Sequence, residues 1–264
     1  MNKLKLLIAF FSPILFGFLS SCSSDNSTNN TQPENIEFLL TGNYWIYERY
    51  YIDSLGNKKS GNSYSDSTFI EGKEDILGKN AFKMKTVTEG TDDVENYCYS
   101  EGEKFYMHSD FINSTLKEML KDLYEKLPIS IEDMWFCIAD YTNNSWLIKI
   151  DTIPTTEIVS GISINGTFTI NGEKGITKNI SVGTKSFNAQ EFKLILKFEG
   201  YISLLPTTKQ AFTIRIHTWF DKKTGILLQT YDESKFAIPG LVTYPFEGFE
   251  RKLIRYNVIK LIDE

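Results

Sequence analysis

The side chains best suited to acid–base, nucleophilic or metal chemistry are few in this chain and lie far apart. The histidines are His108 and His217, and the cysteines are Cys22, Cys98 and Cys137. A zinc site takes about four Cys, His or carboxylate ligands, usually in closely spaced pairs, and a catalytic Cys takes a neighbouring base or cation. The spacing shows neither arrangement, so we expect no metal, no cofactor and no catalytic Cys.

Carboxylates are numerous, but no two of them stand out as a catalytic pair. Hydrolysis of a glycan needs two carboxyl groups that face each other across a cleft. The candidates in extended runs and their turns are Asp53, Asp66, Asp140, Asp151 and Glu157. The chain also has no Gly-x-Ser-x-Gly motif and no phosphate-binding glycine loop. A non-catalytic protein is therefore favoured, with a glycan-processing hydrolase as the alternative.

The N-terminus has the parts of a secretory signal. Two lysines precede an apolar run over residues 6–19, and small residues follow it. The run is shorter than the roughly 20 residues that a membrane-spanning helix needs, and Pro13 interrupts it. A leader over residues 1–21 that is cut away is therefore favoured over a retained span. Residues 19–22, Leu-Ser-Ser-Cys, resemble the lipobox of bacterial lipoproteins, in which the Cys is acylated after cleavage.

This resemblance implies a protein that is held to the bacterial envelope by lipid. Cys22 would become the first residue of the mature chain, and each buried CH₂ of its acyl chains would contribute about 0.8 kcal/mol to membrane binding. In lipoproteins an Asp next to the Cys implies retention at the inner membrane. Ser23 stands at that position, so the resemblance implies the outer membrane, on its periplasmic or its surface side.

The rest of the chain divides into a tether and one domain. Residues 22–36 are rich in Ser, Asn and Thr and cannot bury apolar surface, which predicts a disordered tether. Residues 37–264 are long enough for one substantial core and are predicted to form a single β-rich domain. The formal net charge of −6 argues against a nucleic-acid partner, because a basic stripe is needed to displace counterions. The aromatic content of 14% favours strands.

One segment departs from the strand pattern. Apolar residues between Leu116 and Leu127 recur at helical spacing, Thr115 and Glu118 form a capping-box pattern, and a proline follows. The sequence predicts one amphipathic helix over about 114–127, packed on a face of the sheet.

Alternating apolar and polar residues predict strands in most of the domain. The clearest pattern lies over residues 191–200, where the apolar side chains point one way and the charged ones the other. Over residues 145–151, Trp146, Ile148 and Ile150 are predicted to share one face, and residues 239–246 are predicted to form a Gly/Pro loop. We expect a mainly β protein with an antiparallel curved sheet or half-barrel, covered by the one helix.

Two stretches resemble known envelope proteins. Residues 42–47, Gly-Asn-Tyr-Trp-Ile-Tyr, resemble the opening of uncharacterised Bacteroidota lipoproteins. Residues 219–227 place Asp and Thr-Gly after an aromatic strand end, which is similar to a hairpin of the outer-membrane lipoprotein carrier fold. This resemblance implies a half-barrel whose concave face accepts an apolar or glycan ligand. The remaining alternative is an interaction subunit of an outer-membrane assembly.

Two further covalent modifications are possible from the residue types. Cys98 and Cys137 could form a disulfide in an oxidising compartment or remain two buried free thiols. Three Asp-(Ser/Thr) triplets resemble the O-glycosylation acceptors of Bacteroidota, which would place glycans on Ser54, Ser67 and Thr152. Chance occurrence of these triplets is the alternative.

Aromatic side chains and one histidine are the last candidates for a binding surface. Trp45, Tyr47 and Tyr51 fall on one face of the first strand, with Tyr44, Ile46 and Tyr50 on the other, and one of these two groups could line a groove for glycan or lipid. Packing in the core is the favoured alternative. His217 shares a strand face with Arg215, and could form a polar floor there or simply face solvent.

Overall fold

The computed structural model describes residues 36–61, 63–90, 92–120, 131–232, 234–238 and 242–259. The predicted leader, Cys22 and nearly all of the predicted tether lie outside the described residues. Among the residues that are described, no helix is both long and apolar enough to cross a membrane.

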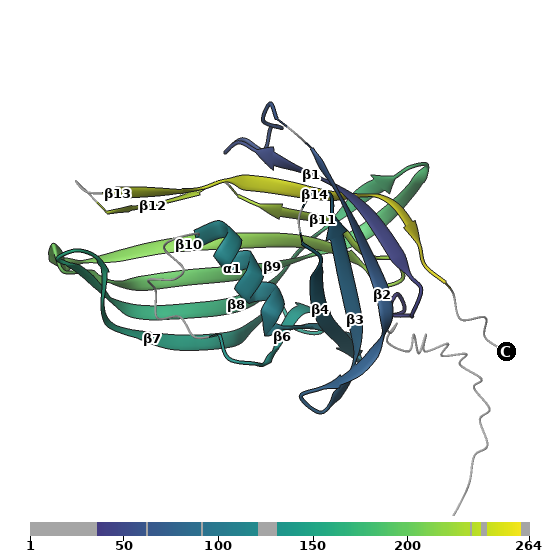
Figure 1. Ribbon diagram of the computed structural model, residues 1–264, viewed down its shortest axis with the longest axis horizontal. Helices are drawn as coiled ribbons and strands as arrows, with labels where there is room; N and C mark the ends of the chain where they lie inside the picture. The colour runs from purple at the N-terminus through teal and green to yellow at the C-terminus, as the bar shows by residue number, and fades with distance from the viewer. Residues whose placement is uncertain are drawn as a thin grey trace, which may run out of the picture. The chain divides into compact units, whose positions relative to one another are not determined.

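Twelve strands form one sheet in which every neighbouring pair is antiparallel. Their order is β6-β5-β4-β3-β2-β1-β14-β11-β10-β9-β8-β7 (Figure 1). The strands are β1 (Tyr44–Ile52), β2 (Tyr64–Ile76), β3 (Lys79–Thr88), β4 (Val94–Glu101), β5 (Lys104–His108), β6 (Trp135–Asp140), β7 (Ser145–Val159), β8 (Ile162–Val182), β9 (Lys185–Ile202), β10 (Leu205–Asp221), β11 (Gly225–Tyr231) and β14 (Gly248–Asn257). Two more strands, β12 (Ser234–Ile238) and β13 (Val242–Phe246), form a separate hairpin. The predicted antiparallel curved sheet is thus confirmed.

The sheet curls into a nearly closed, barrel-like form in which the edge strands β6 and β7 approach each other. Trp146 of β7 donates a hydrogen bond from Nε1 to the carbonyl oxygen of Cys137 in β6, at 2.8 Å. The indole ring lies directly on Gly172 of β8, where a Cβ atom would be 1.9 Å from the ring. A larger residue at position 172 would displace the side chain that links the two edges.

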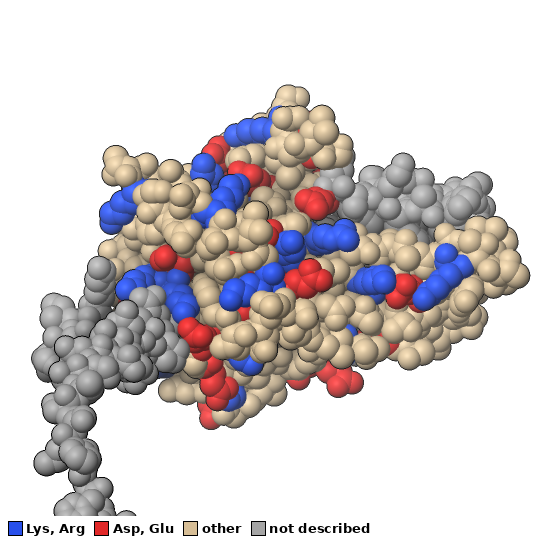
Figure 2. Space-filling model, turned by 180° about the vertical axis from the view of Figure 1, so that it is seen from behind, with Lys and Arg blue, Asp and Glu red and all other residues tan. Residues whose placement is uncertain are grey.

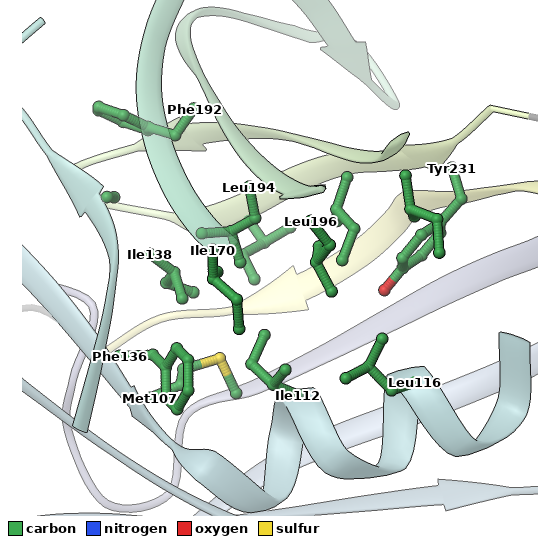
Figure 3. Packing of buried hydrophobic residues seen from close by; sticks show 14 of the residues in the cluster. Met107, Ile112, Leu116, Phe136, Ile138, Ile170, Phe192, Leu194, Leu196 and Tyr231 are labelled. Carbon is green, nitrogen blue, oxygen red and sulfur yellow. The ribbon is translucent and has the colours of Figure 1, made fainter. Parts of the chain in front are cut away.

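The single helix, α1 (Ser109–Leu120), lies across the concave side of the sheet (Figure 1). Ile112 and Leu116 are fully buried; Ile112 points toward Ile170 and Leu196, and Leu116 points toward Tyr231 (Figure 3). Burying two such side chains stabilises the fold by roughly 1.5–3 kcal/mol each. The concave face is therefore filled by α1 and the hydrophobic core.

The predicted helix exists, but its start was wrong. It begins at Ser109 rather than near residue 114, so Thr115 is a buried residue inside the helix and does not cap it. Asp110 lies in the first turn, where a negative charge is favourable. The predicted end of the helix, 121–127, lies outside the described residues.

The alternation over residues 191–200 is confirmed, because the four apolar side chains on one side are all buried. They are Phe192, Leu194, Leu196 and Phe198. The opposite face is wet, with Glu199 held 3.1 Å from Lys197 and 3.3 Å from Lys209. Figure 2 shows cationic and anionic side chains intermixed over the face of the molecule seen from behind.

Two strand predictions were wrong in detail. The pairing of β7 shifts between Leu147 and Lys149, so Ile150 is 56% exposed and does not share a buried face with Trp146. Residues 242–246 of the predicted Gly/Pro loop form β13. By contrast, Trp45 and Tyr47 are buried, as the packing interpretation of the first strand predicts.

The hairpin of β8 and β9 extends beyond the end of β10 as an arm, which we define as residues 176–189. Its pairing is irregular between Lys174 and Thr177, where the arm begins. The arm contacts β10 and β14, because Lys178 Nζ lies 5.3 Å from the centroid of the Trp219 ring and Phe187 packs against Tyr256.

Candidate functional site

Five side chains on β4, β5 and β6 form an aromatic cluster, which comprises Tyr97, Tyr99, Tyr106, His108 and Trp135. Tyr99 and Tyr106 stack with ring centroids 4.6 Å apart, and Trp135 meets Tyr99 edge-on at 4.8 Å and His108 at 5.4 Å. Strand alternation puts them opposite the core residues of the same strands, which are Cys98, Phe105, Met107 and Phe136. The cluster therefore lies on the outer side of the sheet.

The rings of the cluster differ in how far they are buried. Tyr99 and His108 are buried by their neighbours, whereas Tyr97, Tyr106 and Trp135 are half-buried. Burial raises the pKa of Tyr99 to about 12, so its hydroxyl is a neutral hydrogen-bond donor near pH 7.

Charged groups border the cluster on two sides. Lys79 Nζ lies 5.0 Å from the centroid of the Tyr99 ring and 3.2 Å from Glu101. His108 Nδ1 lies 3.0 Å from Asp110 Oδ2. Trp135 Nε1 is buried without a hydrogen-bond partner among the described residues. Apolar ring surface with donors and acceptors beside it is the usual make-up of a small-ligand site.

A second polar group lies where the arm begins. Glu191 Oε1 lies 2.7 Å from Nδ1 of His217, and Oε2 accepts a hydrogen bond from the backbone N–H of Ile176 at 3.2 Å. On the other side of the imidazole, Nε2 lies 3.5 Å from Asp232 Oδ2. A Cβ atom at Gly175 would lie 1.9 Å from Glu191 Oε2. Both imidazole nitrogens thus face carboxylates, and Glu191 joins His217 of β10 to the backbone of β8 where the arm begins.

Sequence reasoning placed His217 on a polar strand face but missed Glu191. The side chain of His217 is 18% exposed, and its ring stacks on Trp219 with centroids 5.9 Å apart. The irregular pairing at Lys174 and Thr177, together with Gly175, creates the space for Glu191. A glycine followed by a shift in the alternation was the signal available in the sequence.

In the part of the chain that the structure describes, each carboxylate considered as a catalytic candidate has a structural contact of its own. Their contacts are Asp53 with the N–H groups of Leu55 and Asn57, Asp66 with Arg251, Asp140 with Thr142, Asn143 and Lys104, Asp151 with Lys149, and Glu157 with the N–H of Gly161. These contacts shape turns and form ion pairs.

The surroundings of Asp140 lower the pKa of its carboxyl group. Burial by itself would raise its pKa, but hydrogen bonds from Thr142 and Asn143 and the ammonium group of Lys104 outweigh burial and lower the pKa from 3.8 to about 2. The ionised carboxylate therefore holds the turn between β6 and β7 closed.

Both described thiols are free. Cys98 is in the core with Sγ 3.2 Å from Met84 Sδ, whereas Cys137 lies two strands away, beside Tyr106 on the other side of the sheet. A disulfide between them is therefore not formed. Burial raises the pKa of Cys137 to about 12 and also raises the pKa of Cys98, so neither is a reactive thiolate near neutral pH.

The three predicted glycan acceptors have different accessibilities. Ser54 is exposed in the turn after β1, and Thr152 is exposed on β7. Ser67 is half-buried in the middle of β2, where it pairs with Ile46 and Val87.

The chain matches no protein-family model and no curated protein. Its fold is similar to a crystal structure described as a "putative lipoprotein" from Parabacteroides distasonis ATCC 8503. The two have a TM-score of 0.48 and 14% sequence identity, over 85% of this chain and 100% of that chain.

Proposed function

We propose that this protein is a non-catalytic binding module that is anchored to the bacterial outer membrane through Cys22 and holds a glycan at the aromatic cluster. The observation that carries this proposal is the group of aromatic rings on the outer side of β4–β6, bordered by hydrogen-bonding groups. The carrier resemblance implied a ligand on the concave face. That face is occupied by α1 and the core, so the ligand is assigned to the outer side.

A sugar ring fits this mixture of groups. Its C–H faces are apolar and pack on aromatic rings, while its hydroxyls need donors and acceptors at the rim. Tyr106 and Trp135 expose part of their rings, and Lys79 and Asp110 supply a cation and a carboxylate. A purely apolar ligand would use the rings alone and would make no hydrogen bonds with these polar groups.

Affinity electrophoresis tests the glycan proposal. The protein is run in native gels that contain soluble mannan, xylan, dextran or bacterial envelope polysaccharide. We expect retardation by at least one of them, and Trp135→Ala or Tyr106→Ala to weaken it about tenfold or more, as truncation of a central aromatic contact does. Phe69→Ala is the matched control, because Phe69 is 39% exposed on β2, outside the cluster.

Two outcomes of this experiment would overturn the glycan assignment. One is a wild-type protein whose migration none of the four polysaccharides changes. The other is retardation that Trp135→Ala leaves intact or that Phe69→Ala abolishes equally.

The anchor is tested separately from the ligand. Cys22→Ser removes the thiol that would be acylated, so the chain should move from the membrane fraction to the soluble envelope fraction. Intact-mass measurement of the wild-type protein should show acyl chains on a polypeptide that starts at Cys22. A wild type with an uncleaved leader, or a Cys22→Ser chain that remains in the membrane, would refute the anchor.

A further inference from the structure

A groove lies between the tip of the arm and the end of β14, and we call it the β14 groove. It has a volume of about 360 Å³ and is lined by residues 182–185 of the arm and 254–258 of β14 and the chain that follows. These nine residues include two cations, Lys185 and Arg255, and no carboxylate. The lining is therefore positively charged in a protein whose formal net charge is −6.

Among the described residues, the two cations have no carboxylate partner of the kind that Lys83 has. Lys83, for comparison, lies 2.9 Å from Glu95 and 3.9 Å from both Glu71 and Glu74. Lys185 Nζ instead donates to the hydroxyl of Tyr256 at 3.2 Å, and in the described part of the chain neither Lys185 nor Arg255 forms an ion pair.

Large apolar side chains are exposed beside these cations. Ile254 in the groove is 48% exposed, and Ile259 is 49% exposed just after β14. Cations next to exposed aliphatic residues and a tyrosine are typical of surfaces that meet lipid headgroups, because the aliphatic groups enter the interface while the cations contact phosphate.

The groove lies near the point where the domain begins. The backbone N–H of Ile259 donates to Asn43 Oδ1 at 2.8 Å, and Asn257 at the end of β14 pairs with Tyr44 at the start of β1. The predicted tether of residues 22–36 would span roughly 20 Å as a flexible chain. An anchor at Cys22 would therefore keep the groove within reach of the bilayer.

We infer that the β14 groove faces the membrane in the anchored protein and binds the phosphate of anionic lipid headgroups. Lys185 and Arg255 supply the charge, and Ile254 and Ile259 enter the headgroup region. This inference rests on the proposed anchor at Cys22 and is independent of the proposed glycan site.

Vesicle binding without the acyl chains tests this inference. The mature chain, residues 22–264 with Cys22→Ser, is sedimented with vesicles of phosphatidylcholine alone and with vesicles in which phosphatidylglycerol makes up about one third of the lipid. We expect binding to the second kind only, weakened about fivefold by Lys185→Ala or Arg255→Ala and about 25-fold by both together. Raising the salt concentration should weaken it as well.

Arg215→Ala is the matched control. Arg215 is an exposed cation on β10 and does not line the groove. Equal binding to both kinds of vesicle, or a loss for Arg215→Ala as large as for Arg255→Ala, would overturn the inference. Failure of the anchor would instead appear in the fractionation of cells, and failure of the glycan site in the polysaccharide gels.

Discussion

Replacing Asp66 with Ala should destabilise the protein by about 3–5 kcal/mol, because it leaves a buried cation without its partner. Asp66 Oδ2 accepts a hydrogen bond from Nε of Arg251 at 2.9 Å, and Oδ1 accepts one from the Thr88 hydroxyl at 2.8 Å. Arg251 also donates to Thr68 at 2.9 Å, and its guanidinium lies 3.7 Å from the centroid of the Tyr47 ring. The contacts of Arg251 with Asp66 and Thr68 thus connect β14 to β2 across β1.

The magnitude follows from burial. The side chains of Asp66 and Arg251 are 4% and 15% exposed, so water can neither solvate a lone charge there nor screen the pair strongly. An exposed pair of the same geometry would contribute about 1 kcal/mol or less. Arg251→Ala should be similarly costly, and the double variant should lose less than the sum of the single losses by at least about 2 kcal/mol.

Equilibrium unfolding in urea, followed by tryptophan fluorescence, measures these free energies. Asp53→Ala is the control, because Asp53 also accepts two backbone hydrogen bonds but lies in an exposed turn. We expect a much smaller loss for it than for Asp66→Ala. Additive losses for Asp66→Ala and Arg251→Ala, or a loss for Asp66→Ala no larger than that of the control, would refute the reasoning.

Three further predictions follow from single sites. The pKa of Asp140 is lowered to about 2. Its ionised form therefore stabilises the protein fully above about pH 4, and this stabilisation is lost as the pH falls through about 2. The difference in urea midpoint between the wild type and Asp140→Asn should shrink over that pH range. Gly175→Ala should cost about 1–3 kcal/mol in the same assay because its methyl group meets a buried carboxylate, whereas Gly61→Ala, with nothing within 4 Å, should cost much less. Thiol titration should find Cys98 and Cys137 unreactive in the folded protein and both free after unfolding in denaturant, and a disulfide-linked mass would contradict this.

The sheet was predictable because its strands have one buried and one wet face. Leu194 and Leu196 are buried, while Lys197 and Glu199 are not. Because successive side chains of a strand point to opposite faces, this difference appears in the sequence as an alternation of apolar and polar residues. The existence of α1 was predictable for the same reason at a period of 3.6, since Leu116 lies on the buried stripe. The start of α1 was not, because Ser109 follows β5 directly and the residues that bury Ile112 come from distant strands.

Irregular pairing explains the errors within strands. A single extra residue near Ile148 moves Ile150 to the exposed side, although the sequence there still alternates. The same kind of irregularity after Lys174 starts the arm and lets Glu191 reach His217. Both shifts depend on which residues the neighbouring strand places opposite, and that information is spread over distant segments.

The aromatic cluster and the β14 groove could not be predicted from the sequence, because both depend on the order of the strands in the sheet. Tyr99 of β4 and Trp135 of β6 lie on the two neighbours of β5 in the sheet, and their rings meet across β5. Along the chain, α1 lies between β5 and β6, so the two residues are far apart in sequence. Lys185 and Tyr256 touch because β14, the last strand, inserts between β1 and β11 instead of extending an edge. Alternation shows which side of a strand is wet, but only the order of strands decides which wet side chains meet. A surface built from several strands therefore appears only once that order is known.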